Sequence, residues 1–431
     1  ETDQFKFDIS RANNWGELKA GFKYDSRDAK GGGAPLATVT NGLVTVDYQP
    51  EETPLWDTDL NNSIGGYYAD NKGIYELLQL DGKQRSDFPE DERLEIEETI
   101  ISAYIMQTVD MDWGNIIFGV RVEDTDYETK GSRLEGQALV PLSVSKDYTN
   151  VLPNAHVNWD VADDHKLRLS FSTGISRPTY IEARAAASIN EVFQSVSGGN
   201  PNLKEETSWG LDAAWEWYFD EASLLSVTAF YRSIDNVIAE SNERVLGSVY
   251  SDLAEPGELW DLSAYGNGKD GKLQGLELAF TGRLDNYIEG FFSGFGIEAN
   301  LTLIDSEYTT PSGLKFDLPG QSDTTFNASL FYEDYGFSAR VSYRYRDAWL
   351  DETETAGVFG LAQGVYWDAQ KRIDLSIRYD LEPLIGQNVS VFLDANNLTD
   401  EKDLRYTGES WNPNQIESYG RRYVVGVRYN L

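Results

Sequence analysis

The sequence predicts an all-β fold, a transmembrane antiparallel β-barrel with about 15 strands in this chain of 431 residues. Apolar and polar residues alternate along many runs of about ten residues, as in strands with two unlike faces. The connections between these runs are short and long in turn. No stretch holds the ~20 consecutive apolar residues of a membrane-spanning helix. A chain that crosses lipid without such helices must form a closed sheet, which pairs every backbone polar group.

The clearest alternation lies between Gly336 and Arg346. Phe337, Val341 and Tyr345 fall on one face, and arginine and serine fall on the other. The runs end in Tyr or Trp and mix Arg with acidic residues, which fits tilted membrane strands with aromatic girdles and a polar lumen. The same pattern occurs in the runs Leu167–Ile175, Ile116–Val122, Leu276–Leu284, Phe326–Tyr332, Ile373–Leu381 and Arg422–Leu431.

The connections sort into two classes that alternate along the chain. Sorting of this kind is typical of an outer-membrane barrel, with short turns in the periplasm and long loops outside. The short connections are Arg11–Gly16, Val109–Trp113, Asp160–Lys166, Phe219–Ser223, Leu284–Gly294, Glu333–Gly336 and Leu381–Asn388. The long connections are Asp25–Glu97, Glu123–Thr149, Gly174–Glu206, Arg232–Asp270, Ile304–Ser322, Tyr345–Gln370 and Asn397–Gln415.

An odd number of strands has a topological consequence. The last strand ends at Leu431 on the short-turn side, so Glu1 falls on the outer side. Bacterial single-chain barrels have an even number of strands, and an exported barrel is expected to begin and end in the periplasm. We therefore interpret residues 1–431 as one transmembrane domain, the C-terminal portion of a larger barrel.

Composition excludes several classes of function. The formal net charge of −36 argues against nucleic-acid binding, which needs a basic surface. Solvated acidic loops explain this charge, although loops that attract cations near lipopolysaccharide are an alternative. The chain has no Cys, and its only histidines are His156 and His165. We predict no metal site, no cofactor and no catalytic residues, so the protein is not expected to be an enzyme.

Several segments in sequence order resemble TonB-dependent receptors, the gated importers of the outer membrane. The resemblance is carried by Ser176-Arg177-Pro178, Gly199-Asn200-Pro201-Asn202-Leu203-Lys204-Glu205-Glu206, Phe230 to Ile238, Gly275-Leu276-Glu277, Asn396-Asn397-Leu398-Thr399-Asp400 and Tyr419 to Tyr423. Physically these residues suit strand ends and turns, because proline lacks a donor and Asn and Asp bond to nearby backbone. The terminal Leu431 departs from the family, whose last residue is usually aromatic.

The resemblance implies a multi-pass protein of the cell outer membrane, within a complete barrel of about 22 strands. It implies uptake of a scarce nutrient and contact with outer-membrane lipids. It also implies coupling to the TonB energy-coupling complex through an N-terminal segment. Neither that segment nor the family's N-terminal plug domain is found in this sequence, so we expect both to belong to a part that is not shown.

Aromatic residues crowd the long connections among carboxylates and amides. Such rings can stack on the apolar faces of sugars while acids accept hydrogen bonds from hydroxyls, so oligosaccharide is the predicted cargo. Alternatively the rings pack the loops together or form a girdle, and Trp349 and Trp411, near strand ends, suit a girdle best. The candidate cargo-binding residues are Trp56, Tyr67, Tyr68, Trp260, Trp349, Trp367 and Trp411.

Arginines alternate along the face that is expected to line the lumen. They could contact a plug or an anionic cargo, but a solvated, salt-bridged wall is the simpler expectation. A ferric siderophore or another metal chelate is the alternative cargo. A passive porin or structural barrel and a soluble secreted β-rich binding protein are alternatives of other classes. The arginines concerned are Arg340, Arg344, Arg346, Arg378, Arg422 and Arg428.

Overall fold

A computed structural model of the chain describes residues 1–31, 94–135, 138–191, 193–249, 251, 254–356, 362–382, 386 and 388–429. These residues form a 20-stranded sheet and a separate 4-stranded sheet. Their helical elements include the short 3-10 helices η2 (Gly247–Val249) and η3 (Phe291–Gly294). None of the described helices is long and apolar enough to cross a membrane.

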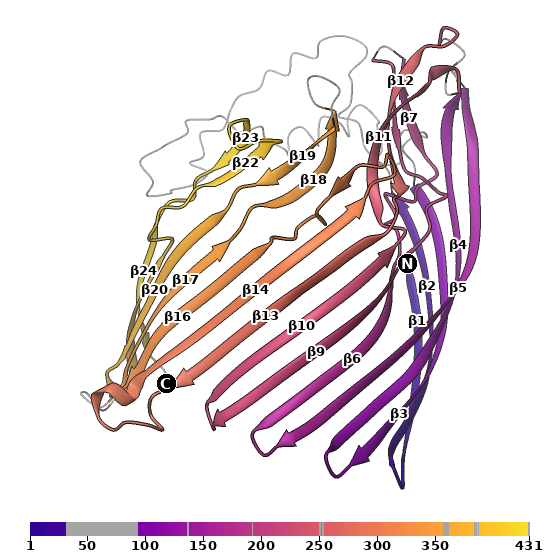
Figure 1. Cartoon of the computed structure of the whole chain (residues 1–431). Coiled ribbons are helices and arrows are strands. Elements are labelled where there is room, and N and C mark those ends of the chain that lie inside the picture. The colour runs from indigo at the N-terminus through magenta and orange to yellow at the C-terminus, as the bar shows by residue number, and fades with distance from the viewer. Residues whose placement is uncertain are drawn as a thin grey trace.

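Fifteen strands of the large sheet form one continuous antiparallel wall, in which each strand pairs with the next along the chain (Figure 1). Among the described residues β1 pairs only with β2, and β24 pairs only with β21. The wall strands are β1 (Thr2–Asn13), β2 (Gly16–Gly31), β3 (Leu94–Met111), β4 (Gly114–Glu135), β5 (Ala138–Ala162), β6 (His165–Ser176), β9 (Glu206–Asp220), β10 (Ser223–Asp235), β13 (Gly271–Arg283), β14 (Phe295–Thr309), β16 (Thr324–Asp334), β17 (Phe337–Arg346), β20 (Gln370–Asp380), β21 (Val389–Asn396) and β24 (Arg422–Tyr429).

The wall confirms the predicted fold class, and the predicted alternation of its connections fails between β4 and β5. Most short connections are tight turns between neighbouring strands. Tyr335 and Gly336 join β16 to β17 with φ values of 51° and 72°, and two successive left-handed residues are what a type I′ hairpin turn requires. One predicted long loop, Glu123–Thr149, is wrong. Strands β4 and β5 continue through it and stay paired as far as Glu135 and Ala138.

The two faces of the wall differ as the alternation predicts. On β17, Arg340 lies opposite Ser376 and Ser342 lies opposite Asp374, so the polar faces of neighbouring strands are in register. Large apolar side chains on the other face stay exposed, among them Val341 at 46%. Such exposure suits a surface that contacts lipid rather than water.

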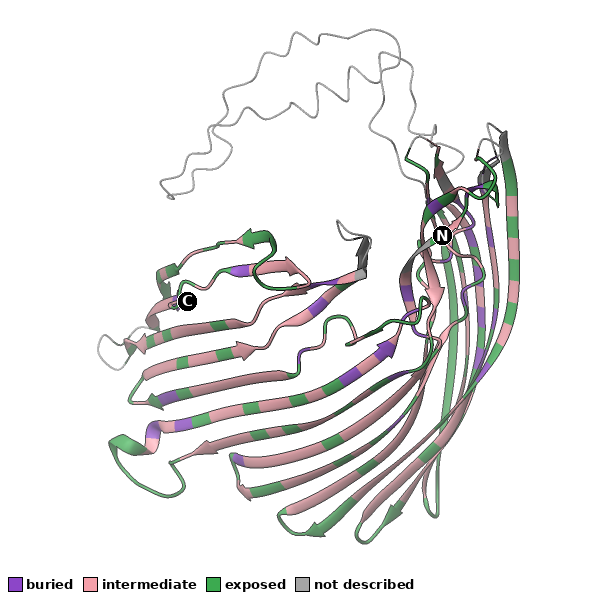
Figure 2. Cartoon of the chain, turned by 45° about the horizontal axis from the view of Figure 1, so that its top comes forward, coloured by how far each residue is buried: buried purple, intermediate pink, exposed green. Residues whose placement is uncertain are grey.

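The outer connections fold into structure that joins the large sheet or stands beside it. The large sheet gains β7 (Ala187–Asn190), β8 (Ser195–Gly198), β11 (Ile238–Leu246), β12 (Leu259–Asn267) and β15 (Lys315–Phe316). The small sheet contains β18 (Trp349–Ala356), β19 (Ala362–Trp367), β22 (Asp403–Thr407) and β23 (Pro413–Glu417). Buried positions gather mostly toward the outer ends of the strands (Figure 2). A small core forms there around Val237 of the connection between β10 and β11, Tyr308 of β14 and Leu350 of β18.

Candidate functional site

The connection between β6 and β9 lies against the inner face of the wall, and we call residues 177–205 the strap. Arg177, its first residue, donates to the Glu123 carboxylate at 2.7 Å and to the Thr125 hydroxyl at 2.9 Å, both on β4. The Arg177 and Glu123 side chains are only 21% and 12% exposed. This charge-assisted contact fixes the point at which the chain leaves β6.

Backbone groups of the strap are held by the same wall. The Tyr127 hydroxyl donates to the carbonyl of Ala183 at 3.2 Å, and the Ala185 amide donates to the hydroxyl of Thr129 at 3.1 Å. At the far end of the strap, the Lys146 ammonium donates to the Leu203 carbonyl at 2.6 Å. A loop inside a protein needs partners for its polar backbone, and β4 and β5 supply them here.

Local sequence gives the strap its bends. The Thr179 amide donates to the Glu182 carboxylate at 2.6 Å, and the Glu182 amide donates back to the Thr179 hydroxyl at 3.4 Å. This reciprocal pair closes a turn in the manner of a capping box. A Cβ atom on Gly199 would lie 2.5 Å from the side chain of Arg184, so this position accepts only glycine without movement of its neighbours.

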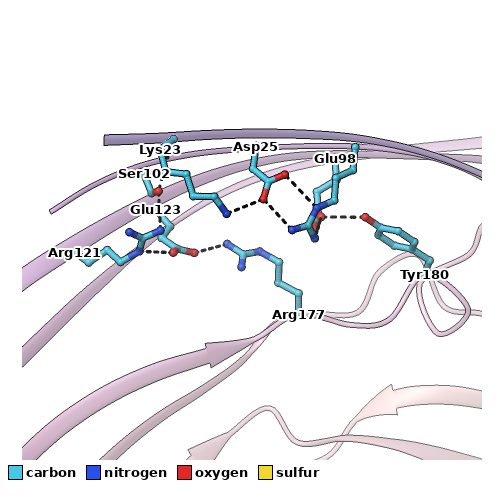
Figure 3. Close-up of polar contacts among 9 residues, drawn as sticks. Lys23, Asp25, Glu98, Ser102, Arg121, Glu123, Arg177 and Tyr180 are labelled. Atoms are coloured by element: carbon cyan, nitrogen blue, oxygen red, sulfur yellow. Dashed lines mark hydrogen bonds and ion pairs between the residues drawn. The ribbon is translucent and has the colours of Figure 1, made fainter. Parts of the chain in front are cut away.

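Beside the strap, charged side chains of β2, β3 and β4 form a network on the inner wall (Figure 3). Asp25 is 2% exposed and accepts from Lys23 at 2.9 Å and from Arg27 at 2.8 Å. On β4, Arg121 pairs with Glu123 at 2.6 Å. Glu123 therefore lies between Arg121 and Arg177, which links the strap to the wall network.

Tyr180 of the strap completes the network by donating to the Glu98 carboxylate at 3.2 Å. Burial, followed by the charge of Glu98, raises the pKa of Tyr180, so its hydroxyl stays protonated and remains a donor. Figure 3 shows Arg177 and Tyr180 pointing from the strap toward the strands. The contact thus joins the strap to β3 as well as to β4.

The network borders a cavity of ≈ 470 Å³ on the lumen side of the wall. Four basic groups line it, from Lys23, Arg27, Arg121 and Arg177, together with the carboxylates of Asp25, Glu98 and Glu123. One positive charge is therefore in excess. Such a cavity can accept hydrogen bonds from hydroxyls and can also bind an anionic group.

The cargo-binding residues predicted from the sequence do not come together in one place. Trp56, Tyr67 and Tyr68 lie outside the described residues. Trp260 lies on β12 and is 2% exposed, with its ring beside Gly247. Its ring therefore has no free face in this conformation, and its part in cargo binding remains a prediction.

The other three predicted residues belong to the small outer sheet and its turns. Trp349 and Trp367 lie opposite each other on β18 and β19 and stack with centroids 6.3 Å apart. The Arg346 guanidinium lies 3.6 Å from the centroid of the Trp349 ring, a cation–π contact. Trp411, in the turn between β22 and β23, is 80% exposed and is the most accessible of them. Whether they bind cargo stays a prediction.

Several lumen-face arginines are paired as the salt-bridged wall predicts. Arg340 contacts Glu298 at 2.6 Å, and Arg344 contacts Asp374 at 2.8 Å. Arg346 instead donates to the Ser322 hydroxyl and the Gly320 carbonyl. Two of the six predicted arginines are thus ion-paired among the contacts described.

Sequence reasoning missed most of the strap site. It identified Arg177 within a motif but assigned the segment that holds Glu123 to a loop. The sequence does carry a signal of this strand. In residues 121–129 both alternating sets of side chains are mainly charged or polar, so neither face of the strand is apolar. Alternation of that kind is what a strand looks like above the membrane, where both of its faces can be polar.

A family model described as TonB dependent receptor-like, beta-barrel matches residues 1–398. No curated protein matches the chain.

Several solved structures share the fold. The ferric-catecholate import receptor Fiu from E. coli matches with a TM-score of 0.61 and 11% identity, over 99% of this chain and 54% of that one. The FrpB iron transporter from Neisseria meningitidis matches with a TM-score of 0.57 and 16% identity, over 99% and 54%. The ferric yersiniabactin uptake receptor FyuA from Yersinia pestis matches with a TM-score of 0.57 and 14% identity, over 99% and 53%. The chain thus spans about half the length of these proteins.

Proposed function

The chain belongs to the TonB-dependent receptor β-barrel family of the outer membrane, and we propose that it forms the C-terminal wall of a gated importer for a scarce nutrient. The proposal includes a plug domain and further strands, supplied by a part of the protein outside this chain. It also includes coupling to the TonB complex through that part. Receptors of this family are transporters, so no enzymatic step is assigned.

The observation that carries the proposal is the anchored strap. The two ends of the strap are held to the inner wall by contacts of Arg177, Tyr127, Lys146 and Tyr180. A passive porin needs an open aqueous lumen, whereas a gated importer needs fixed structure inside the barrel against which other parts can move. The strap supplies such structure on the lumen side of β4.

For the cargo we propose an oligosaccharide. The cavity beside the strap offers three carboxylates and a tyrosine hydroxyl, which suit hydroxyl-rich ligands. Most of its basic groups already have carboxylate partners, so little charge remains for a multiply charged anion. The exposed Trp411 ring adds a stacking surface at the outer side.

A ferric chelate is the second candidate. The excess positive charge of the cavity favours an anionic cargo, and Arg346 on the lumen face is bonded to neutral groups only among the contacts described. Fiu and FyuA are named for ferric chelates and FrpB for iron, but identities of 11–16% show a shared fold and leave the cargo open.

Uptake by cells that make the full-length receptor tests both parts of the proposal. Labelled oligosaccharides and labelled ferric chelates are offered separately, with and without a protonophore that abolishes the proton-motive force. Uptake of one cargo class that stops with the protonophore supports gated import. Uptake that continues unchanged would identify a passive channel and overturn the proposal.

A further inference from the structure

The outward face of the wall carries a groove of ≈ 600 Å³ across β5, β6, β9 and β10. Its floor is formed by Ala213 and Ala229, which lie directly opposite each other on β9 and β10 and are both exposed. Leu211 and Tyr231 form the next pair toward the outer side, and Leu169 lies beside Ala213. Two small residues among large ones thus leave a depression in the apolar surface.

The groove is apolar because its polar lining residues face the other way. The Asp212 carboxylate accepts two hydrogen bonds from Arg232, at 2.8 and 2.9 Å, on the inner face. The Ser170 hydroxyl bonds to His156 at 2.9 Å on the same inner face. Both residues therefore contribute little more than backbone to the groove, which leaves alkyl and aromatic side chains as its surface.

Aromatic side chains near both ends of these strands indicate how deep in the membrane the groove lies. On the periplasmic side, His165 stacks on Trp215 and Trp217 with centroids 5.5 and 5.7 Å apart. On the outer side, the ring centroids of Trp209 and Tyr231 lie 5.4 Å apart. Such rings sit at the two membrane interfaces of a barrel. Ala213 lies midway between Trp209 and Trp217, so the groove runs from the bilayer centre to the outer interface, about 10 Å along the membrane normal.

We propose that this groove is a binding site for one acyl chain of an outer-leaflet lipid. The groove is continuous with the lipid-facing surface on both sides, through Val157 opposite Leu169 and Leu276 opposite Ala229. Hydrocarbon is therefore its neighbour in the membrane, and its uncharged walls exclude a polar occupant. A chain held against two alanines gains dispersion contacts that a flat strand surface cannot offer.

Two substitutions test the site in the full-length receptor. Ala213→Phe with Ala229→Phe fills the floor, and Ala339→Phe adds the same ring on the outward face of β17 as a matched control. Native mass spectrometry of receptor extracted gently from outer membranes measures the retained lipid and identifies it. We expect wild type and A339F to retain one outer-leaflet glycolipid, and the double variant to retain about ten-fold less.

Equal retention by all three proteins, or retention of phospholipid alone, would overturn the proposal. If the double variant fails to fold, photocrosslinking of wild-type receptor provides the test. The receptor is placed in vesicles that contain an outer-leaflet glycolipid with a diazirine in the middle of one acyl chain. Crosslinks concentrated on β6, β9 and β10 would support the groove. Crosslinks that are as frequent on β16 and β17 as on these strands would contradict it.

Discussion

Arg177 and Glu123 are 54 residues apart in the sequence, yet they form a 2.7 Å ion pair that ties the strap to β4. Both side chains are mostly buried, and loss of Arg177 leaves the Glu123 carboxylate with Arg121 as its remaining cationic partner. We predict that Arg177→Ala lowers the free energy of local opening of the strap by about 2 kcal/mol. Amide exchange in residues 177–205 should then become about 30-fold faster, as measured by hydrogen–deuterium exchange.

An exposed ion pair provides the matched control for that change. Arg244 and Asp261 lie 2.8 Å apart on β11 and β12, and each is 64% exposed. Arg244→Ala removes the same chemical group where water replaces the partner, so no measurable change in exchange is expected. Equal effects of the two substitutions would show that Arg177 does not hold the strap.

Asn397 is predicted to be essential to the connection between β21 and β24. It has a φ of 55°, its side-chain oxygen accepts from the Glu401 amide at 2.8 Å, and its side-chain nitrogen donates to the Gly420 carbonyl at 3.1 Å. Asn397→Ala loses these bonds and places alanine, which tolerates the left-handed region less well than asparagine, at this positive φ. We expect a loss of about 2–4 kcal/mol in urea unfolding in detergent micelles.

Asn397→Gly separates the two causes. Glycine accepts the left-handed conformation but makes no side-chain bond, so it should recover part of the loss, about 1 kcal/mol. If Asn397→Gly were as unstable as Asn397→Ala, the backbone conformation would contribute nothing and the hydrogen bonds alone would explain the motif.

These two sites show what could be read from the sequence and what could not. The Asn396 to Asp400 motif acts within a few residues, so its turn-forming role followed from residue types alone, and the structure confirms that role. The membrane strands were also predictable, because lipid on one face and lumen on the other impose a period of two. The partner of Arg177 could not be predicted, because β4 above the membrane is polar on both faces. The contact also depends on tertiary folding, which brings the strap to β4. The small sheet of β18, β19, β22 and β23 was missed for the same reason.

Glu206, the first residue of β9, lies on the outer side of the interfacial residue Trp209 and is predicted to make stability depend on pH. Burial raises the pKa of Glu206, and the Ile238 amide, which donates to it at 2.7 Å, opposes this shift only in part. The contribution of Glu206 to stability is therefore fully present below the ordinary carboxyl pKa and is lost as pH rises through the higher folded-state pKa. Glu206→Gln keeps a hydrogen-bond acceptor and removes the charge.

The difference in melting temperature between Glu206→Gln and wild type should therefore grow in favour of the variant as pH rises from 4 to 7. Measuring the difference cancels the titration of other carboxylates that the two proteins share. A difference that is constant with pH, or one that favours wild type at pH 7, would show that Glu206 is not destabilised by burial.

Trp411 and Trp367 are predicted to respond differently to truncation, which tests where the cargo binds. Trp411 is 80% exposed, so Trp411→Ala should leave stability unchanged and weaken cargo binding about ten-fold, a typical cost for a tryptophan at a binding surface. Trp367 stacks on Trp349, so Trp367→Ala should cost about 1 kcal/mol of stability. Calorimetric titration of the full-length receptor with the cargo that supports uptake measures the affinities, and thermal unfolding measures the stabilities. If Trp367→Ala abolished binding while Trp411→Ala did not, the cargo would bind at the stacked pair, and the exposed turn between β22 and β23 would have no part in recognition.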